Sequence, residues 1–412
     1  MNATIDQTGR RRARRVLGTC STTHAAHDGL SDMLYVLLPG LAEQFGLSLV
    51  QVGLIRGAHR TAMSLFQIPA GLLAERLGER ILLTVGTALA GVFIILAAMT
   101  SGFFALLALL FLVGLGQAVQ HPLCSSILSA AHRGGGRRGA LGTYNFAGDL
   151  GKFTIAGSCS LLLAAGVAWQ APAMGFGMVM VLGAALLMVA LIRLNVGGAP
   201  AVPDSTEARK AKGWGITHRS GFVSLCAIAA IDNGTRSGFL TFVAFLMLAK
   251  GVPEGWALQA IPALLIGGMA GKLACGYLAD RIGVIRTVVV TEVATAIGML
   301  LILVLPNFAA FALLPVLGVA LNGTSSVLYG TIGDLVESDR QSRAFGLFYT
   351  LGTVSAIAAP LAYGTLGDWI GIEIALAIAA CLVLLTIPFA LALRPALALQ
   401  ADAACTNDNR KI

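Results

Sequence analysis

The fold is decided by one short stretch, Gly71-Leu-Leu-Ala-Glu-Arg-Leu-Gly-Glu-Arg80, because the chain contains a second version of it. The second version, Gly276-Tyr-Leu-Ala-Asp-Arg-Ile-Gly-Val-Ile-Arg286, begins 205 residues later. Each has a glycine, an acid four places on, an arginine directly after the acid, and another glycine two places further. Each also follows an apolar segment of the length that crosses a bilayer, so its charges fall where that helix must leave the membrane.

The residue types in this motif predict how two membrane helices are joined. Gly71 has no side chain and would let two helices approach closely. The acid Glu75 can lie against the positive N-terminus of a neighbouring helix, and Gly78 permits a tight turn. We expect both copies of the motif to act in gating, through Gly71, Glu75, Arg76, Gly78, Arg80, Gly276, Asp280, Arg281 and Gly283.

The repeated pattern resembles G-x-L-x-D-R-x-G-x-R, the motif between the second and third helices of each half of a major facilitator superfamily transporter. A single copy would be weak evidence, since a generic charged turn between two helices would explain it. Two copies at half-chain spacing favour the resemblance. The resemblance implies an all-α membrane protein with 12 transmembrane helices in two pseudo-symmetric six-helix halves, which is the major facilitator fold.

The composition independently predicts a membrane protein. Of the 412 residues, 57% are hydrophobic and 12% are charged, whereas soluble domains have about 25% charged residues. The seven cysteines stand singly, without the close pairs typical of metal sites or disulfide frameworks, so we expect neither. We expect no cofactor and no enzyme activity, because no nucleotide-binding loop or catalytic triad is recognisable.

Apolar segments of about 20 residues, the length that crosses a bilayer, recur along the chain with short polar gaps. In the first half we place them at 23–43, 50–73, 81–99, 103–130, 140–167 and 171–193. In the second half we place them at 221–249, 256–279, 287–305, 308–335, 343–366 and 371–393. The predicted parts are a basic arm (1–22), an N-terminal half (23–194), a linker (195–220), a C-terminal half (221–393) and a tail (394–412).

The distribution of positive charge predicts the orientation. Of the 28 Lys and Arg residues, 22 fall in the arm, the linker, the tail and the loops on the same side. Cytoplasmic loops are enriched in these residues, so we expect both termini in the cytoplasm and the protein in the inner or plasma membrane. The arm lacks the apolar run of a signal peptide. The net charge of +8 therefore indicates orientation rather than binding to nucleic acid.

Two further pairs of segments repeat between the halves. Ala25-Ala-His-Asp28 in the first helix is similar to Ala229-Ala-Ile-Asp232 in the seventh. Arg138, with Ala140-Leu-Gly behind it, opens the fifth helix much as Arg343-Ala-Phe-Gly opens the eleventh. Parallel repeats of this kind place the substrate site between the two halves, near the middle of the membrane.

Charged residues inside spanning helices predict where that site is. They are costly in lipid, so they usually face a cavity or a partner and mark a transport pathway. An α-helix rises 1.5 Å per residue, and counting from the helix ends puts four of them near mid-depth: Asp32, Arg60, Lys152 and Asp232.

The spacing of these charges predicts how they pair. Asp28 and Asp32 share one face of the first helix, and the second helix carries two arginines four places apart. Like charges at this spacing repel unless opposite charges meet them. We therefore expect the two acids to face Arg56 and Arg60, with Asp32 against Arg60. In the fifth helix, Asp149 and Lys152 are three places apart and can pair with each other.

Two functions can be assigned to these residues. A cationic side chain can bind a carboxylate, phosphonate or sulfonate, which predicts substrate contacts from Arg56, Arg60, Lys152 and Arg236. A carboxyl group whose surroundings change during transport can take up and release a proton, which predicts proton coupling at Asp32 first, then Asp149, Asp28 or Asp232. The alternative is a set of fixed ion pairs that only holds helices together.

The other polar residues of the helices have less distinctive surroundings. His24 and His27 stand near the inner end of the first helix, where they either relay protons or are simply solvated. Lys272 and Glu292 are expected to extend to the cytoplasmic ends of their helices.

A narrower resemblance covers most of the first half. It rests on His24-x-x-x-Asp28, Leu38-Pro39, Gln51-x-Gly53-Leu-Ile, Ser64-Leu-x-Gln67-x-x-x-Gly71, Gly114-x-Gly116-x-x-x-x-His121-Pro122 and Asn145-x-x-Gly148-x-x-Gly151, and continues through Asn322-Gly-Thr-Ser-Ser and Ala359-Pro360. Together these resemble the fosmidomycin-resistance branch of the superfamily. The resemblance implies efflux by a drug–proton antiporter and antibiotic resistance, with His121 and Asn145 as further candidate substrate contacts.

Three departures from drug antiporters leave the direction of transport open. Leu110 stands where they commonly carry an arginine, and Gly148-Asp-Leu-Gly151 stands where they carry a Gly-Pro motif. Glu75 replaces the usual aspartate. The pair His121-Pro122 also has a structural interpretation, a kink whose freed carbonyl is satisfied by the imidazole.

Three functions therefore stay open. The sequence favours proton-coupled export of small anionic or zwitterionic compounds by alternating access. The alternatives are proton-coupled uptake of an organic anion and a transporter-like membrane sensor or scaffold. The expected partners are a small-molecule substrate, protons and membrane lipid, without nucleic acid, and the expected state is a monomer.

Overall fold

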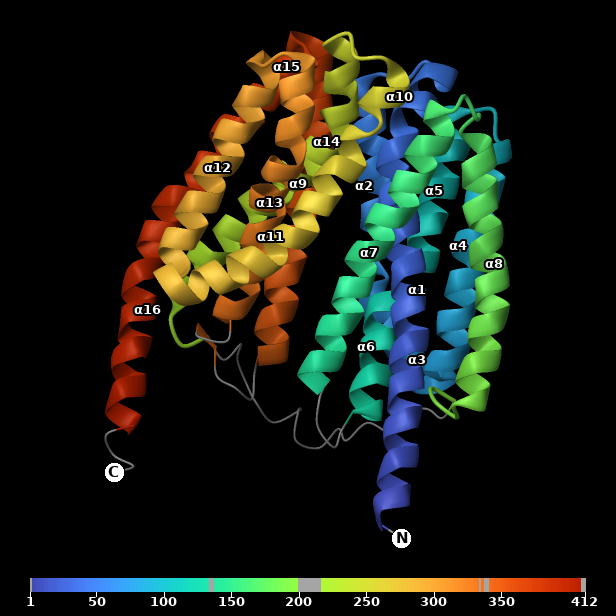
Figure 1. Cartoon of the computed structure of the whole chain (residues 1–412), viewed down its shortest axis with the longest axis vertical. Helices are drawn as coiled ribbons and strands as arrows, with labels where there is room; N and C mark the ends of the chain where they lie inside the picture. The colour runs from blue at the N-terminus through green and yellow to red at the C-terminus, as the bar shows by residue number, and fades with distance from the viewer. Residues whose placement is uncertain (1, 133–136, 199–215, 333–334, 337–340, 409–412) are drawn as a thin grey trace. The chain divides into compact units, whose positions relative to one another are not determined.

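The computed structural model describes residues 2–132, 137–198, 216–332, 335–336 and 341–408, and almost all of them are helical (Figure 1). The first eight helices are α1 (Asn2–Phe45), α2 (Leu49–Leu65), α3 (Gln67–Leu77), α4 (Glu79–Met99), α5 (Phe103–Gln117), α6 (Gln120–Ala131), α7 (Arg137–Ala164) and α8 (Gln170–Arg193). They are followed by α9 (Arg219–Ala249), α10 (Glu254–Ala257), α11 (Ala260–Ile282), α12 (Val284–Val304), α13 (Asn307–Ile332), α14 (Gln341–Ile370), α15 (Ile372–Leu382), η2 (Val383–Leu385) and α16 (Thr386–Asp408). Most of the predicted linker (199–215) and parts of two basic loops (133–136 and 337–340) lie outside the described residues.

These elements form the twelve predicted membrane spans, four of which are interrupted. The breaks lie between α2 and α3, between α5 and α6, between α10 and α11, and at the 3-10 turn η2. The break before α6 consists of Ala118 and Val119, both with right-handed helical backbone angles, so the predicted kink near His121-Pro122 stays a prediction. Pro122 stands in the first turn of α6, where its missing N–H group costs no helical hydrogen bond.

The spans differ in how apolar they are. Among the described residues, eight helical segments are long and apolar enough to cross a membrane. The other four spans, formed by α1, α2 with α3, α7 and α9, are the ones that carry the charged residues predicted to form the site. Because ionised groups are costly in lipid, these four helices must turn their charged faces towards protein partners.

The structure corrects three predicted boundaries. The basic arm is helical, since α1 begins at Asn2 and runs unbroken to Phe45. At the other end, α16 continues to Asp408 through most of the predicted tail. The first motif is also mainly helical, because α3 continues to Leu77 and only Gly78 separates it from α4. Hydropathy located the membrane boundaries, but without a helix-breaking sequence a helix continues beyond them.

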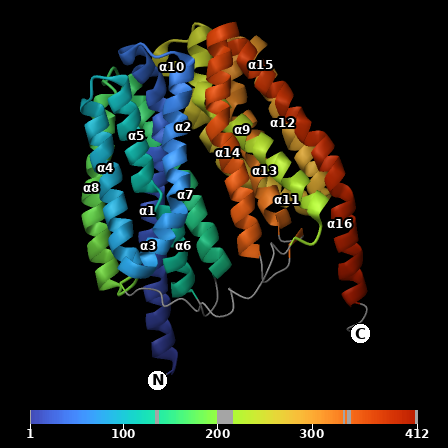
Figure 2. The same ribbon diagram turned by 180° about the vertical axis from the view of Figure 1, so that it is seen from behind.

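The chain divides into two compact units. Unit 1 comprises residues 1–47, 54–209 and 254–262, and unit 2 comprises residues 48–53, 210–253 and 263–412. In unit 1, α1 packs along α7 and α4 packs along α8 (Figure 1). In unit 2, α9 packs along α14 and α16, and α12 packs along α13 (Figure 2). Each unit has its own apolar core, which includes Val16, Leu83 and Leu191 in unit 1 and Leu225, Leu328 and Leu393 in unit 2.

Close contact between α1 and α7 depends on two glycines. A Cβ atom at Gly29 would lie 2.7 Å from the Gly151 carbonyl oxygen, and one at Gly151 would collide with the backbone of Ala25. The motif glycines Gly71 and Gly276 do not have this role, because a Cβ at either would meet no atom within 4 Å. That prediction was wrong: the backbones come close where α1 crosses α7.

The two motif turns are formed as predicted. Gly78 and Gly283 have φ angles of 81° and 88°, in the region that favours glycine. Arg80 has a further role, since its Nε and Nη2 atoms donate to the Val196 carbonyl at 3.1 and 2.9 Å. Arg12 donates to Leu194 and Asn195 beside it, at 2.9 and 2.8 Å. Two arginines therefore satisfy carbonyl groups at the negative end of α8.

The contact of α1 with α7 can be tested at Gly151. Gly151→Ala should lower the free energy of unfolding by about 1–3 kcal/mol, the usual cost of overpacking, because the new methyl group would press on Ala25. The control is Gly142→Ala on the same helix, where a Cβ meets open space. It should leave the protein as stable as the parent or slightly more so, since alanine favours helix over glycine. Thermal unfolding of the purified protein in detergent measures both, and equal midpoints for the two variants would contradict the proposed packing role.

Candidate functional site

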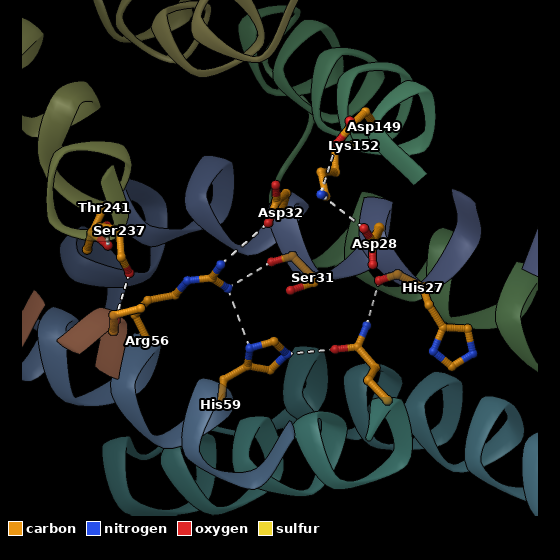
Figure 3. Close-up of polar contacts among 12 residues, drawn as sticks. His27, Asp28, Ser31, Asp32, Arg56, His59, Asp149, Lys152, Ser237 and Thr241 are labelled. Carbon is orange, nitrogen blue, oxygen red and sulfur yellow. Dashed lines mark hydrogen bonds and ion pairs between the residues drawn. The ribbon is translucent and has the colours of Figure 1, made fainter. Parts of the chain in front are cut away.

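The candidate site in unit 1 is organised around one face of α1. Asp28 and Asp32 lie one helical turn apart on this face, and both are buried. They do not both meet the arginines of α2, as the sequence had suggested. Asp32 contacts α2, whereas Asp28 contacts α7 and α6, so the two acids are the centres of two neighbouring clusters (Figure 3).

The first cluster surrounds the guanidinium group of Arg56, which is completely buried. Its Nη1 donates to the Ser31 carbonyl at 3.0 Å, and its Nη2 lies 3.4 Å from an oxygen of Asp32. The guanidinium carbon lies 3.8 Å from the centre of the Tyr35 ring, a cation–π arrangement. The predicted pairing of Asp32 with Arg60 was therefore wrong, because Arg56, one turn away on the same face, takes that place.

A chain of hydrogen bonds extends from Arg56 and fixes the protonation of His59. Arg56 Nη1 lies 3.4 Å from His59 Nδ1, and since arginine can only donate, Nδ1 must accept. His59 Nε2 therefore carries the proton and donates to Gln117 Oε1 at 2.7 Å. Gln117 in turn donates to the His27 carbonyl at 2.9 Å. The chain is complete with a neutral His59, and it returns to α1.

The second cluster surrounds the carboxylate of Asp28. One oxygen lies 3.0 Å from Lys152 Nζ and 3.2 Å from His24 Nε2, and the other lies 3.4 Å from His121 Nε2. Lys152 also contacts Asp149 at 3.1 Å, which confirms the predicted pair on α7. Figure 3 shows Asp28 and Lys152 pointing towards each other from α1 and α7. The His121 imidazole thus faces a carboxylate rather than a freed carbonyl.

The geometry at His24 defines a place for one proton. His24 Nδ1 lies 2.8 Å from the Tyr144 carbonyl, which can only accept, so Nδ1 carries a hydrogen. The opposite nitrogen, Nε2, is buried and faces Asp28. In a neutral imidazole this nitrogen would turn its lone pair towards the carboxylate. The contact becomes favourable when one proton lies on either His24 or Asp28.

His27 has a structural role in the same helix. Its Nε2 lies 2.8 Å from the Thr87 hydroxyl, which itself donates to the Leu83 carbonyl at 2.7 Å, so Nε2 is the donor. Both His24 and His27 are buried rather than solvated. Of the two predicted proton relays, only His24 therefore faces an acid.

The remaining predicted contacts in unit 1 are more open. Arg60 is partly exposed, and its buried Nε has no hydrogen-bond partner among the described residues. Lys152 retains about a quarter of its side-chain exposure. Asn145 is exposed one turn before Asp149 on α7. An arginine with an unused donor and a partly exposed lysine are suitable for binding an anion.

In unit 2, Asp232 and Arg236 do not form a direct pair of the kind seen at Asp28. Arg236 Nη2 donates to Asn233 Oδ1, and Asn233 donates to the Ala229 carbonyl at 2.8 Å. Asp232 is buried, and its Oδ2 has no hydrogen-bond partner among the described residues. The two predicted residues thus lie on one turn of α9 with different surroundings.

The gating role of the motif stays a prediction. Arg76, Asp280 and Arg281 are exposed, and Arg281 lies over the Tyr277 ring at 4.5 Å. The side chain of Glu75 lies outside the described part of the structure.

Sequence reasoning missed His59, Gln117, Tyr144 and Asn233. None of them is charged at neutral pH, and single neutral polar residues within apolar helices give little signal. His59 follows Arg56 by three places, which puts both on one helix face. This spacing could have indicated that His59 lies beside Arg56.

A helical membrane protein with buried or half-buried charged residues on several of its spans has the features of a secondary transporter. The sequence profile of the Major Facilitator Superfamily matches residues 22–316 and 255–403. The chain belongs to the Major Facilitator Superfamily, whose members are membrane transporters and not enzymes.

Three similar proteins support this membership. The chain is 29% identical over 133 residues to the gentisate transporter of Corynebacterium glutamicum, covering 32% of this chain and 30% of that protein. It is 29% identical over 137 residues to the fosmidomycin resistance protein of Escherichia coli, covering 33% of each. The matched stretches thus span about a third of both relatives. A solved bacterial homologue of the human lysosomal transporter Spinster has the same fold, with a TM-score of 0.80 and 15% identity over 94% of this chain and 98% of that one.

The difference between the two arginines of α2 gives a prediction. Arg56→Ala should lower the free energy of unfolding by about 3–5 kcal/mol, the usual cost of breaking a buried ion pair, because Asp32 would be left buried without its partner. Arg60→Ala should cost less than half as much, because Arg60 is partly exposed. Denaturant titration of both variants measures the difference. A more destabilising change at Arg60 would show that the roles are reversed.

Proposed function

We propose that the chain is a proton-coupled transporter of small organic anions that works by alternating access. The observation that carries this proposal is the contact of Asp28 with both His24 and Lys152. A proton at the His24–Asp28 contact cancels the carboxylate charge that holds Lys152. The ammonium group then keeps Asp149 as its only acidic partner in this cluster and gains affinity for an anionic group of a substrate.

The charge balance of the site supports the same coupling. The buried or half-buried charges of unit 1 near this face are three acids and three bases: Asp28, Asp32, Asp149, Arg56, Arg60 and Lys152. The charges of these six residues sum to zero when no substrate is bound. An anion entering alone would leave a net negative charge in surroundings of low dielectric constant, where it is costly. One proton bound with the anion restores the balance.

The names of two relatives agree with an anionic substrate. Gentisate is an aromatic carboxylate and fosmidomycin is a phosphonate, and the proteins named for them are similar to this chain. A carboxylate and a phosphonate can both accept hydrogen bonds from the partly exposed cations Arg60 and Lys152. We propose these two residues as the first substrate contacts in unit 1, with His121 and Asn145 beside them.

The geometry favours uptake, although the sequence alone favoured export. When a proton and an anion bind in concert, they move in the same direction, which is inward where the proton gradient points inward. We place the basic loops and both termini in the cytoplasm, in accordance with the excess of Lys and Arg on that side. Export stays the second candidate because of the similarity to a fosmidomycin resistance protein.

Proton coupling can be tested at Asp28. In proteoliposomes, Asp28→Asn should abolish accumulation driven by a proton gradient but preserve exchange of substrate across the membrane, because exchange needs no net proton movement. Asp149→Asn is the matched control, since it removes the other partner of Lys152 but not the proton site. It should keep gradient-driven accumulation. An Asp28→Asn variant that accumulates as well as the parent would refute the assignment.

Asp32 was the first choice from the sequence, and the structure gives it a different expected phenotype. Asp32→Asn should lower stability, because Asp32 is the acidic partner of the buried Arg56. If Asp32→Asn abolishes accumulation driven by a proton gradient while the free energy of unfolding is unchanged, Asp32 rather than Asp28 is the proton-binding residue.

The direction of proton movement during transport distinguishes uptake from export. Proteoliposomes containing a pH-sensitive dye are given an outside pulse of one compound from a panel of aromatic carboxylates, phosphonates and cationic dyes. A co-transported anion should acidify the lumen as it enters, whereas an antiported compound should make it more alkaline. Acidification by a carboxylate or phosphonate is the expected result. Alkalinisation would support export, and an unchanged lumenal pH with every compound would support the sensor or scaffold.

A further inference from the structure

Three side chains of unit 1 converge in the way that the ligands of a metal ion do. His24 and Asp28 lie one turn apart on α1, and His121 meets them from the first turn of α6. One nitrogen of each histidine and one oxygen of the carboxylate all lie within 4.8 Å of one another. Spacing along the chain does not predict this group, because α1 and α6 are distant in sequence.

The separations between these atoms suit a small divalent ion. His24 Nε2 lies 3.2 Å from one oxygen of Asp28, and His121 Nε2 lies 3.4 Å from the other. Ligand atoms that each lie about 2.0–2.2 Å from a tetrahedral zinc ion are about 3.3–3.6 Å apart. The observed separations are therefore close to those that such an ion requires.

The hydrogen bonding of His24 leaves one ring nitrogen for a ligand. Its Nδ1 donates to the Tyr144 carbonyl at 2.8 Å, so in the neutral ring the lone pair is on Nε2. Metal-binding histidines usually donate their other nitrogen to such an acceptor, which fixes the tautomer and the ring orientation. His24 is 3% exposed, and its Nε2 has no hydrogen-bond partner among the described residues. A metal ion would satisfy this buried lone pair.

Packing against α7 holds the His24 ring in position. The Tyr144 ring stacks on it, with the two centroids 4.1 Å apart. Gly148, one turn further along α7, leaves the room that the ring needs, because a Cβ atom there would lie 2.6 Å from His24 Nε2. A ligand whose rotamer is fixed by its neighbours is preorganised for binding.

The charges around the three ligands are compatible with a cation. Lys152 lies 3.0 Å from Asp28, but it also contacts Asp149 at 3.1 Å, and one carboxylate oxygen can bind an ion while the other contacts the lysine. The two acids and the lysine together carry a net charge of −1. Three protein ligands leave the fourth tetrahedral position open to water or an anion. The His121 side chain is 35% exposed, which gives an ion access.

We propose that His24, Asp28 and His121 form a binding site for a divalent transition metal ion, with Zn²⁺ as the best fit. Two imidazole nitrogens favour zinc over magnesium and calcium, which prefer oxygen ligands. The existence of this metal site does not depend on the proposed function. Its effect on transport does, because the ion would occupy the Asp28 carboxylate that the proposed coupling uses. Bound Zn²⁺ should therefore inhibit accumulation driven by a proton gradient.

Calorimetric titration of the purified full chain with Zn²⁺, without a histidine tag and after treatment with a chelator, tests the metal site. The parent should bind one ion at this site. His121→Ala should weaken binding at least about tenfold, since loss of even an outer-shell partner of a ligand costs about 10–100-fold. The matched control is His132→Ala, which removes a histidine that bonds only to the Leu128 carbonyl. It should bind as the parent does.

Equal affinities of His121→Ala and the parent would overturn the proposal. Asp28→Asn should also weaken binding at least about tenfold, and it gives an independent answer if His121→Ala does not fold. Gly148→Ala removes no ligand but should weaken binding as well, because the new methyl group would displace the His24 ring.

X-ray absorption spectroscopy of the zinc-loaded protein identifies the ligand atoms. This measurement is needed because the chain has seven cysteines, which also bind zinc. The proposed site predicts nitrogen and oxygen ligands at about 2.0–2.2 Å. A sulfur ligand at about 2.3 Å would place the ion on cysteines and overturn the proposal.

Accumulation in proteoliposomes with and without saturating Zn²⁺ tests the effect on transport. Zn²⁺ should lower gradient-driven accumulation by the parent at least about tenfold, whereas the accumulation left in His121→Ala should be insensitive to it. If the parent does not accumulate substrate even without Zn²⁺, the proposed function fails, and calorimetry alone decides whether the metal site exists. If Zn²⁺ binds through nitrogen and oxygen but leaves accumulation unchanged, the metal site stands and the coupling role of Asp28 is refuted.

Discussion

Unit 1 depends on the need to neutralise ionised groups in the interior of a membrane protein. Its first helix carries two aspartates one turn apart, and neither can remain charged in lipid without a partner. The two aspartates find their partners on different helices. Arg56 of α2 contacts Asp32, while Lys152 of α7 and His121 of α6 contact Asp28. Three elements are thus held against α1 by polar contacts, and the glycines at the crossing of α1 and α7 bring the Lys152 side chain close enough to take part.

Much of this arrangement could be predicted from the sequence. Apolar length and the doubled motif identified the twelve spans, because these features depend on bilayer thickness and on turn geometry rather than on detailed packing. The Asp149–Lys152 pair could be predicted because both residues lie on one helix at a fixed spacing. The sequence could not predict that Arg56, rather than Arg60, contacts Asp32. The two arginines lie one turn apart on one face, and helix tilt and axial shift decide which of them reaches Asp32.

Two further errors have the same physical cause. The depth of Glu292 from a helix end suggested contact with the membrane surface, but the face that it occupies is buried against neighbouring helices. Gly71 and Gly276 belong to a recognisable motif, yet close packing occurs at Gly29 and Gly151 instead. Sequence spacing gives the face and the depth of a residue. It does not give the neighbour on that face, which depends on contacts between segments distant in the chain.

The two clusters of unit 1 are linked by hydrogen bonds through Gln117. Gln117 bonds the His59 side chain to the backbone carbonyl of His27, the residue directly before Asp28. Arg56, His59, Gln117 and α1 therefore form a closed ring of contacts in which every hydrogen bond has a defined direction. Hydrogen bonds that close such a ring resist local rearrangement. If protonation weakens the contact between Asp28 and Lys152, as we propose, the ring predicts that α1 and α2 respond as one body and that movement occurs at the interface of α1 with α7.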